Sequence, residues 1–128
     1  MIRPFVLEDS RSLCDMLMAE GLKKDQMDFL DNETWVYENE GVKGFYTFKI
    51  EYDIFPHLQH FCIRGDCRGG SVARALIRHF KDRVKAFRKA IINSPVSNEF
   101  VDKVIRRYFK IDKPYSVDNE HKFYWVNV

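Results

Sequence analysis

The residues that most constrain the fold are 57–88, where a strand pattern runs through a glycine-containing loop into a long amphipathic helix. Val72, Leu76, Phe80 and Val84 recur at i+4 spacing, and the opposite side carries the cations Arg74, Arg78, Lys81, Lys85 and Arg88. That period belongs to a helix with one buried face. The loop, residues 65–70, reads G-D-C-R-G-G. The unit therefore predicts a helix packed against a sheet.

Shorter patterns predict the remaining elements. Strands are indicated at Ile2–Val6, Thr34–Glu38, Val42–Asp53, His57–Arg64, Ala90–Ile92 and His121–Val128, and Asn39-Glu40-Gly41 joins the second and third as a hairpin. A first helix is capped by Asp9 or Ser10, presents Leu13, Cys14, Leu17 and Met18, and ends at Gly21. A short helix is indicated within Lys23–Leu30, and another, capped by Ser97, presents Phe100, Val101, Val104, Ile105, Tyr108 and Phe109 before Lys113-Pro114. The order predicts an α/β (α+β) fold with a mixed sheet flanked by helices.

Length and composition predict one globular domain, residues 1–128. No stretch approaches the roughly 20 apolar residues of a membrane span, and the first ten residues lack a secretory apolar run. We therefore expect a cytoplasmic protein without a membrane partner. Cys14, Cys62 and Cys67 are odd in number and form no C-x-x-C pair, so neither a disulfide framework nor a zinc site is predicted.

Charge is distributed unevenly along the chain. Residues 1–63 hold six Lys/Arg and twelve Asp/Glu, whereas residues 64–128 hold fifteen and seven, so the two halves carry −6 and +8. A basic half indicates a phosphate-bearing partner, either nucleic acid or a nucleotide-like cofactor. A solvated helix face is the third interpretation of the same cations.

The segment Arg68-Gly69-Gly70-Ser71-Val72-Ala73 has the composition of an anion site. Glycines let the backbone approach a phosphate closely, and the first-turn N–H groups and the helix dipole point toward it. Neither G-x-x-x-x-G-K-[ST] nor G-x-G-x-x-G is present, which disfavours nucleoside triphosphates and NAD. A plain strand-to-helix turn with two glycines is the alternative.

This segment resembles the hallmark of the GCN5-related N-acetyltransferase superfamily, Q/R-x-x-G-x-G/A, here Arg68-x-x-Ser71-x-Ala73. The opening Ile2-Arg3-Pro4, the hairpin residues 41–45 and the helix end Arg107-Tyr108-Phe109-Lys110-Ile111 also resemble that superfamily, as does the element order. The resemblance implies a mostly antiparallel sheet. Two residues depart from the pattern: Ser71 replaces a favoured Gly, and Asp112 stands where Gly usually ends the fourth helix.

The resemblance implies acetyl-CoA as co-substrate. Its pyrophosphate would lie on the amides of the hallmark loop and its pantetheine arm along the preceding strand, which assigns cofactor binding to Ile63, Arg68, Gly69, Gly70, Ser71, Val72, Ala73 and Arg74. The resemblance also implies an acid near the end of the fourth helix, Tyr108, which protonates the departing thiolate. A core tyrosine on the apolar stripe is the other interpretation of Tyr108.

A base must also take a proton from the attacking ammonium. The matching strand offers His57 and His60, with Glu51 on the strand before it. Histidine suits this task because its ordinary pKa of about 6.5 leaves it mostly neutral at pH 7. On a regular strand the two rings would point to opposite faces, so only one would reach the cleft, and they could not share a metal. A strand histidine without a chemical role is the alternative for each.

The sequence thus predicts an acetyl-CoA-dependent N-acetyltransferase acting on an amine by direct attack in a ternary complex. Asp25, Asp28, Asp31 and Glu33 form an acidic cluster that suggests a cationic acceptor. The alternatives are an inactive binding or structural protein with the same fold, and a module that binds nucleic acid through the basic half. The sequence favours nucleic acid least and leaves a homodimer open.

Overall fold

The computed structural model describes residues 1–21, 31–95, 99–111 and 113–128. Seven strands form one sheet in the order β1-β2-β3-β4-β5-β7-β6. The strands are β1 (Ile2–Pro4), β2 (Glu33–Glu38), β3 (Val42–Glu51), β4 (Phe55–Ile63), β5 (Lys89–Pro95), β6 (Ser116–Val117) and β7 (His121–Asn127). All neighbours are antiparallel except β4 and β5, so the predicted mixed, mostly antiparallel sheet is confirmed.

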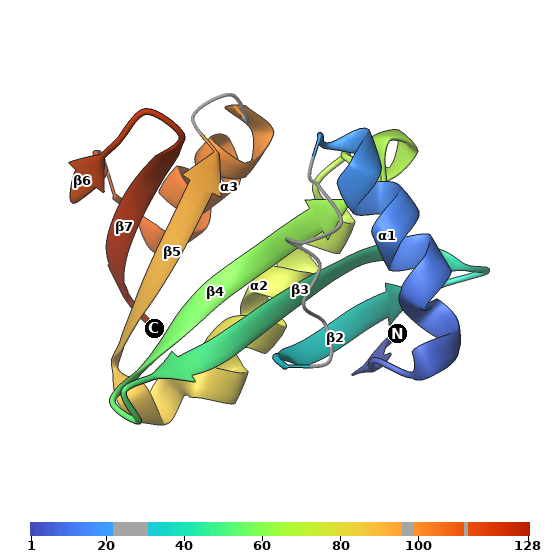
Figure 1. The fold of residues 1–128 in the computed structure, drawn as a ribbon, viewed down its shortest axis with the longest axis horizontal. Helices are drawn as coiled ribbons and strands as arrows, with labels where there is room; N and C mark the ends of the chain where they lie inside the picture. The colour runs from blue at the N-terminus through green and yellow to red at the C-terminus, as the bar shows by residue number, and fades with distance from the viewer. Residues whose placement is uncertain (22–30, 96–98, 112) are drawn as a thin grey trace.

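In the described part of the chain, three α-helices cover the two faces of this sheet (Figure 1). Helix α1 (Ser10–Ala19) lies on one face, and α2 (Ser71–Val84) and α3 (Glu99–Phe109) lie on the other. The α1 side is a small core, in which Leu13 and Leu17 meet Phe45 and Cys62. The larger core lies under α2 and α3, where Phe80 packs edge-on against Tyr46. On the sheet face that carries α1, this helix covers only part of the sheet, and no described helix covers the strands β5, β7 and β6 (Figure 1).

Helix α2 begins and buries its apolar side as its period predicts. Val72, Leu76, Phe80 and Val84 are all at most 7% exposed. Gly44 on β3 lets this helix approach, since a Cβ there would lie 2.9 Å from the Ile63 side chain and 3.1 Å from that of Leu76. Phe87 follows the helix in a 3₁₀ turn and is 39% exposed.

Several predicted boundaries shift for identifiable reasons. Strand β4 includes Pro56 rather than starting after it, because the chain reverses at residues 52–54, where Tyr52 and Asp53 adopt positive φ. Strand β1 ends at Pro4, and α1 ends at Ala19 before Gly21 at φ +87°. The structure adds β6, whose two residues are too few to form a sequence pattern.

Two helix details differ in part from the prediction. Asp9 is the N-cap residue of α1, but its side chain makes no cap hydrogen bond, since its carboxylate is bound by both terminal nitrogens of Arg3 at 2.8 Å and by the Val6 amide. Met18 is 55% exposed instead of buried. The predicted helix within Lys23–Leu30, the Ser97 cap and Asp112 lie outside the described residues.

A bulge in β4 changes which side chains share a face. Thr47 pairs with His60 but Phe48 pairs with Leu58, so Gln59 is the extra residue. Lys49 then pairs with His57. Directly paired residues project to the same face, and Thr47 and Lys49 are two residues apart on β3. His57 and His60 therefore lie on the same face of the sheet, which corrects the prediction for a regular strand.

The parallel ladder between β4 and β5 is short. In the described part of the chain it consists of the pairs His57–Ile91 and Leu58–Ile92. Beyond them β4 continues to Ile63 and β5 to Pro95, and Figure 1 shows the two strands diverging from each other there. The ladder pairs between β4 and β5 within the described residues thus belong to the N-terminal half of β4.

Among the described residues, no helix is long and apolar enough to span a membrane. The three cysteines are free thiols, and burial raises the pKa of the Cys62 thiol to about 12. No group of three or more His, Cys, Asp or Glu within the described ranges is arranged to hold a metal ion.

Candidate functional site

The N-terminus of α2 opens into a polar cavity of about 560 Å³. Gly70 precedes the helix with φ +106°, a conformation that favours glycine, and its carbonyl accepts the first helical hydrogen bond from the Arg74 amide at 3.0 Å. The amides of residues 71–73 belong to the unpaired first turn of a 14-residue helix. The cavity is lined by Gly69, Gly70, Ser71, Arg74, Arg78, Arg107 and Tyr108.

Three arginines give this cavity its charge. Arg74 and Arg78 are exposed one turn apart on α2, and Arg107 comes from α3. Acidic residues are missing from the lining, so guanidinium groups and a helix N-terminus face the same space. This arrangement suits a ligand with several phosphate charges. Arg78 and Arg107 were not singled out from the sequence, although Arg78 follows Arg74 by one helical turn.

The predicted cofactor residues divide into three groups. Gly69, Gly70, Ser71 and Arg74 line the cavity, whereas the side chains of Val72 and Ala73 are buried in the core behind it. Arg68 and Ile63 line a separate space of about 290 Å³ between α1 and the end of β4. Arg68 there binds Glu20 and donates to the Ile63 carbonyl, and its guanidinium lies 4.9 Å from the Phe100 ring centre.

Tyr108 lies at the edge of the polar cavity. Its side chain is half-buried and lines the space together with the glycine loop, while its carbonyl accepts a hydrogen bond from the Lys81 ammonium. The Arg107 guanidinium lies 5.5 Å from the centre of its ring. The structure therefore brings the predicted acid beside the predicted phosphate loop, although the two are more than thirty residues apart in sequence.

His57 is held between two polar partners on the opposite face of the sheet from α2. Its Nδ1 lies 2.9 Å from Glu51 Oε1, and its Nε2 lies 2.9 Å from Asn93 Oδ1. The hydrogen bond from His57 holds the pKa of Glu51 below its usual range. If Nδ1–H donates to this carboxylate, a neutral ring keeps its lone pair on Nε2, which an Asn93 amide turned to present its NH₂ group would satisfy.

His60 is placed differently although it lies on the same face. The residue is buried, with 9% of its surface exposed, and its Nδ1 lies 2.8 Å from the Thr47 hydroxyl. His57 has a side-chain exposure of 17% and lies in the first of the two ladder pairs, one residue before the last pair between β4 and β5. Of the two histidines, His57 is therefore the more accessible to a ligand.

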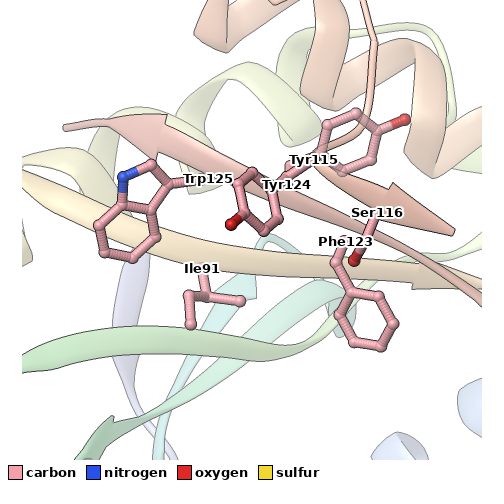
Figure 2. Close-up of a pocket in the computed structure, with 6 residues that line it drawn as sticks. All are labelled: Ile91, Tyr115, Ser116, Phe123, Tyr124 and Trp125. Atoms are coloured by element: carbon pink, nitrogen blue, oxygen red, sulfur yellow. The ribbon is translucent and has the colours of Figure 1, made fainter.

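A second pocket, of about 360 Å³, lies next to His57 on the face without a described helix (Figure 2). It is lined by Ile91, Tyr115, Ser116, Phe123, Tyr124 and Trp125, from β5, β6, β7 and the residue before β6. Ile91 pairs directly with His57 on one side and with Trp125 on the other. Sequence analysis missed this pocket because its lining comes together only through the strand order.

The acidic cluster predicted to attract a cationic acceptor is not available as a unit. Asp25 and Asp28 lie outside the described residues. Glu33 is bound by the Arg83 guanidinium through two contacts of 2.8 Å and also accepts from the Trp35 indole at 2.7 Å. Because Arg83 belongs to α2, Glu33 is directed toward the face opposite His57.

No family model and no curated protein sequence matches the chain. Solved structures match it over nearly its whole length. An IAA acetyltransferase from Bacillus cereus is 16% identical in sequence and has a TM-score of 0.76. The match covers 100% of this chain and 99% of the acetyltransferase chain. A diaminobutyrate acetyltransferase from Paenibacillus lautus, solved with L-2,4-diaminobutyric acid and coenzyme A, is 13% identical with a TM-score of 0.77, over 99% and 93%.

A phosphinothricin acetyltransferase of the GNAT superfamily from Sinorhizobium meliloti, solved with AcCoA, is 14% identical with a TM-score of 0.76, over 100% of this chain and 88% of its own. At these identities the likeness concerns the fold. The chain therefore has the fold of the GCN5-related N-acetyltransferase superfamily, as the sequence resemblance predicted.

Proposed function

We propose that the protein is an acetyl-CoA-dependent N-acetyltransferase that acts on an amine by direct attack in a ternary complex. The observation that carries this proposal is the polar cavity at the N-terminus of α2. Unpaired helix amides, a glycine at φ +106° and the guanidinium groups of Arg74, Arg78 and Arg107 converge on one space. The pyrophosphate of acetyl-CoA fits this chemistry because it is a compact multiple anion.

The C-terminal end of β4 supports the same assignment. From Phe61 to Ile63, where β4 diverges from β5 (Figure 1), the described chain shows no ladder pair between the two strands. An extended ligand with amide groups can hydrogen-bond to such an edge as a further strand would. A cofactor anchored at Gly70 would then run along β4 toward His57, which brings its thioester to the face that carries the second pocket.

Two residues are proposed for proton transfer. The acceptor ammonium replaces Asn93 as the partner of His57 Nε2, which takes a proton from it, and the Glu51 carboxylate fixes the ring by holding Nδ1–H. The free amine then attacks the thioester carbonyl carbon, a C–N bond forms and the C–S bond breaks. Tyr108 donates its hydroxyl proton to the leaving thiolate, and the second proton, which the nitrogen loses as the amide forms, restores the Tyr108 hydroxyl. We assign the base to His57 rather than His60 because His60 is buried against Thr47.

Thermal unfolding with and without acetyl-CoA tests the proposal. A ligand present at 100 times its dissociation constant adds about 2.7 kcal/mol to the free energy of unfolding. We expect acetyl-CoA to raise the melting temperature. Pantetheine, which lacks the phosphates of the cofactor, should raise it less. No increase at millimolar acetyl-CoA would refute the proposed function.

The base is tested by the pH dependence of kcat/KM. His57→Gln should remove the acidic limb of the profile while leaving acetyl-CoA affinity unchanged. Glu51→Gln, which keeps a hydrogen-bond acceptor but removes the charge, should lower kcat without changing acetyl-CoA affinity, because the carboxylate that orients the His57 ring is lost. An unchanged pH profile in His57→Gln together with an unchanged kcat in Glu51→Gln would remove His57 from the mechanism.

A further inference from the structure

The pocket beside His57 differs sharply in chemistry from the phosphate cavity. Resting on the proposed function, we infer that the acceptor is a small primary amine with an aromatic or bulky apolar body and without a carboxylate, bound in the pocket of Figure 2. The inference depends on the lining, the volume and the position of this pocket relative to His57.

The lining is apolar and partly exposed. Figure 2 shows Ile91 and Phe123 projecting from neighbouring strands toward the same side of the sheet. Trp125 is 40% exposed, and its ring meets Phe55 edge-on at 5.2 Å between ring centres. Aromatic side chains left in contact with water beside a concave space are typical of ligand sites. An aromatic or branched apolar group would cover Ile91, Phe123 and Trp125 together.

The volume limits what can be bound. Small-molecule pockets range over roughly 300–1,000 Å³, and 360 Å³ lies near the lower end. A single ring with a short side chain is of suitable size. A folded protein acceptor could insert only a single side chain into a pocket of this size. The rest of the surface of that protein would make no contact with the pocket.

Charge excludes several common acceptor classes. None of the six lining residues carries a charge, so no cation in the lining pairs with the carboxylate of a free amino acid. A polyamine would leave its second ammonium group against Ile91 or Trp125 with no acidic partner in the lining. An amine with one ammonium at the end of an apolar body has neither difficulty.

The polar end of such an amine would meet the residues proposed for catalysis. Ile91 is paired with His57, and Asn93, two residues further along β5, contacts His57 Nε2. Glu51 binds His57 and, at 3.5 Å, the Lys49 ammonium through the same oxygen, Oε1. The nitrogen of the acceptor thus lies beside the proposed base when its apolar body fills the pocket.

Intrinsic fluorescence provides a binding assay, because the chain has only two tryptophans and one of them lines the pocket. Trp35 packs against His79 with ring centres 4.5 Å apart, under α2. The probe is 2-phenylethylamine, which is not excited at tryptophan wavelengths, with phenylalanine and spermidine for comparison. In the matched control Trp35→Phe, 2-phenylethylamine should still change the emission, and in Trp125→Phe it should not.

A calorimetric titration of Trp125→Ala completes the test. The dissociation constant for 2-phenylethylamine should rise about tenfold or more, as expected when a buried aromatic contact is lost, while acetyl-CoA affinity is unchanged. Equal affinity for phenylalanine would overturn the exclusion of carboxylates. Absence of 2-phenylethylamine binding in a protein that binds acetyl-CoA would overturn the pocket assignment alone.

Two further outcomes separate this inference from others. If 2-phenylethylamine binds through Trp125 but acetyl-CoA does not bind, the proposed function fails and the pocket assignment stands as a ligand site. If sedimentation shows a dimer that Trp125→Ala converts to a monomer, the pocket is an interface between copies of the chain, and the inference is overturned.

Discussion

Substitution of Gly70 by aspartate tests the phosphate cavity most directly, provided that its charge is separated from its backbone strain. A Cβ at this position meets no atom within 4 Å, so steric conflict does not contribute. The φ of +106° strains any side chain by about 1–2 kcal/mol. Gly70→Asn carries nearly the same strain and shape without the charge, which makes it the matched control.

The magnitude follows from Coulomb's law. Two unit charges about 4 Å apart interact by roughly 4 kcal/mol at an effective dielectric constant of about 20. At physiological ionic strength, with a Debye length of about 8 Å, about 2.5 kcal/mol remains, or roughly 70-fold in affinity. At 1 M salt the Debye length is about 3 Å, and the ratio between the two variants should fall to below about tenfold.

Isothermal titration of coenzyme A against wild type, Gly70→Asn and Gly70→Asp at low and high salt measures these ratios. Gly70→Asp should bind far more weakly than Gly70→Asn, and salt should narrow the gap. Equal affinities in the two variants, with both proteins folded by circular dichroism, would refute the placement of the phosphates at the N-terminus of α2.

Three other predictions concern different parts of the molecule. Tyr108→Phe should keep coenzyme A affinity and lower kcat by roughly 10²-fold if the hydroxyl protonates the thiolate; equal kcat in steady-state thiol release would remove Tyr108 from the mechanism. Gly44→Ala should cost about 1–3 kcal/mol in urea unfolding, because its Cβ would lie 2.9 Å from a side-chain carbon and 3.0 Å from a backbone oxygen of β4. Gly65→Ala, whose Cβ meets nothing within 4 Å, is the control and should change stability by under about 0.5 kcal/mol. Burial lowers the pKa of His79, whose Nδ1 accepts from the Tyr46 hydroxyl at 2.6 Å. The stabilisation of the fold by the neutral His79 ring should therefore be complete above pH 6.5, the ordinary pKa, and should be lost as the pH falls from 6.5 through the lowered pKa of the folded protein. His79→Gln should remove this part of the pH dependence of the urea midpoint.

Local patterns in the sequence predicted the elements that fold according to their own period. Helix α2 is the clearest case, since its buried positions and its glycine start can be read without knowing what surrounds them. The hairpin at residues 39–41 is another, because Glu40 and Gly41 adopt the positive φ that its turn requires. In both cases the determining interactions are close in sequence.

The site depends on interactions that no local pattern reports. The extra residue Gln59 moves His57 to the face of His60, and a bulge has no reliable signature in a strand of alternating residues. Arg107 reaches the glycine loop only because α3 packs beside α2. The contact of His57 with Asn93 needs β4 and β5 to be neighbours, which a helical crossover creates after more than thirty residues.

The short parallel ladder fits the proposal that the two pockets serve one reaction. The sheet is paired on either side, from β1 to β4 and from β5 to β6, so the place where β4 and β5 diverge is where we propose that a ligand joins the α2 face to the opposite face. Four residues of β4, His60 to Ile63, lie along this divergence, and at about 3.3 Å per residue they extend over roughly 13 Å. The phosphate cavity lies beyond the Ile63 end, at the start of α2, and the apolar pocket lies beyond the other end, at His57 and Ile91. A long, flexible ligand with an anionic head can therefore be anchored at one end while its reactive end reaches an acceptor at the other.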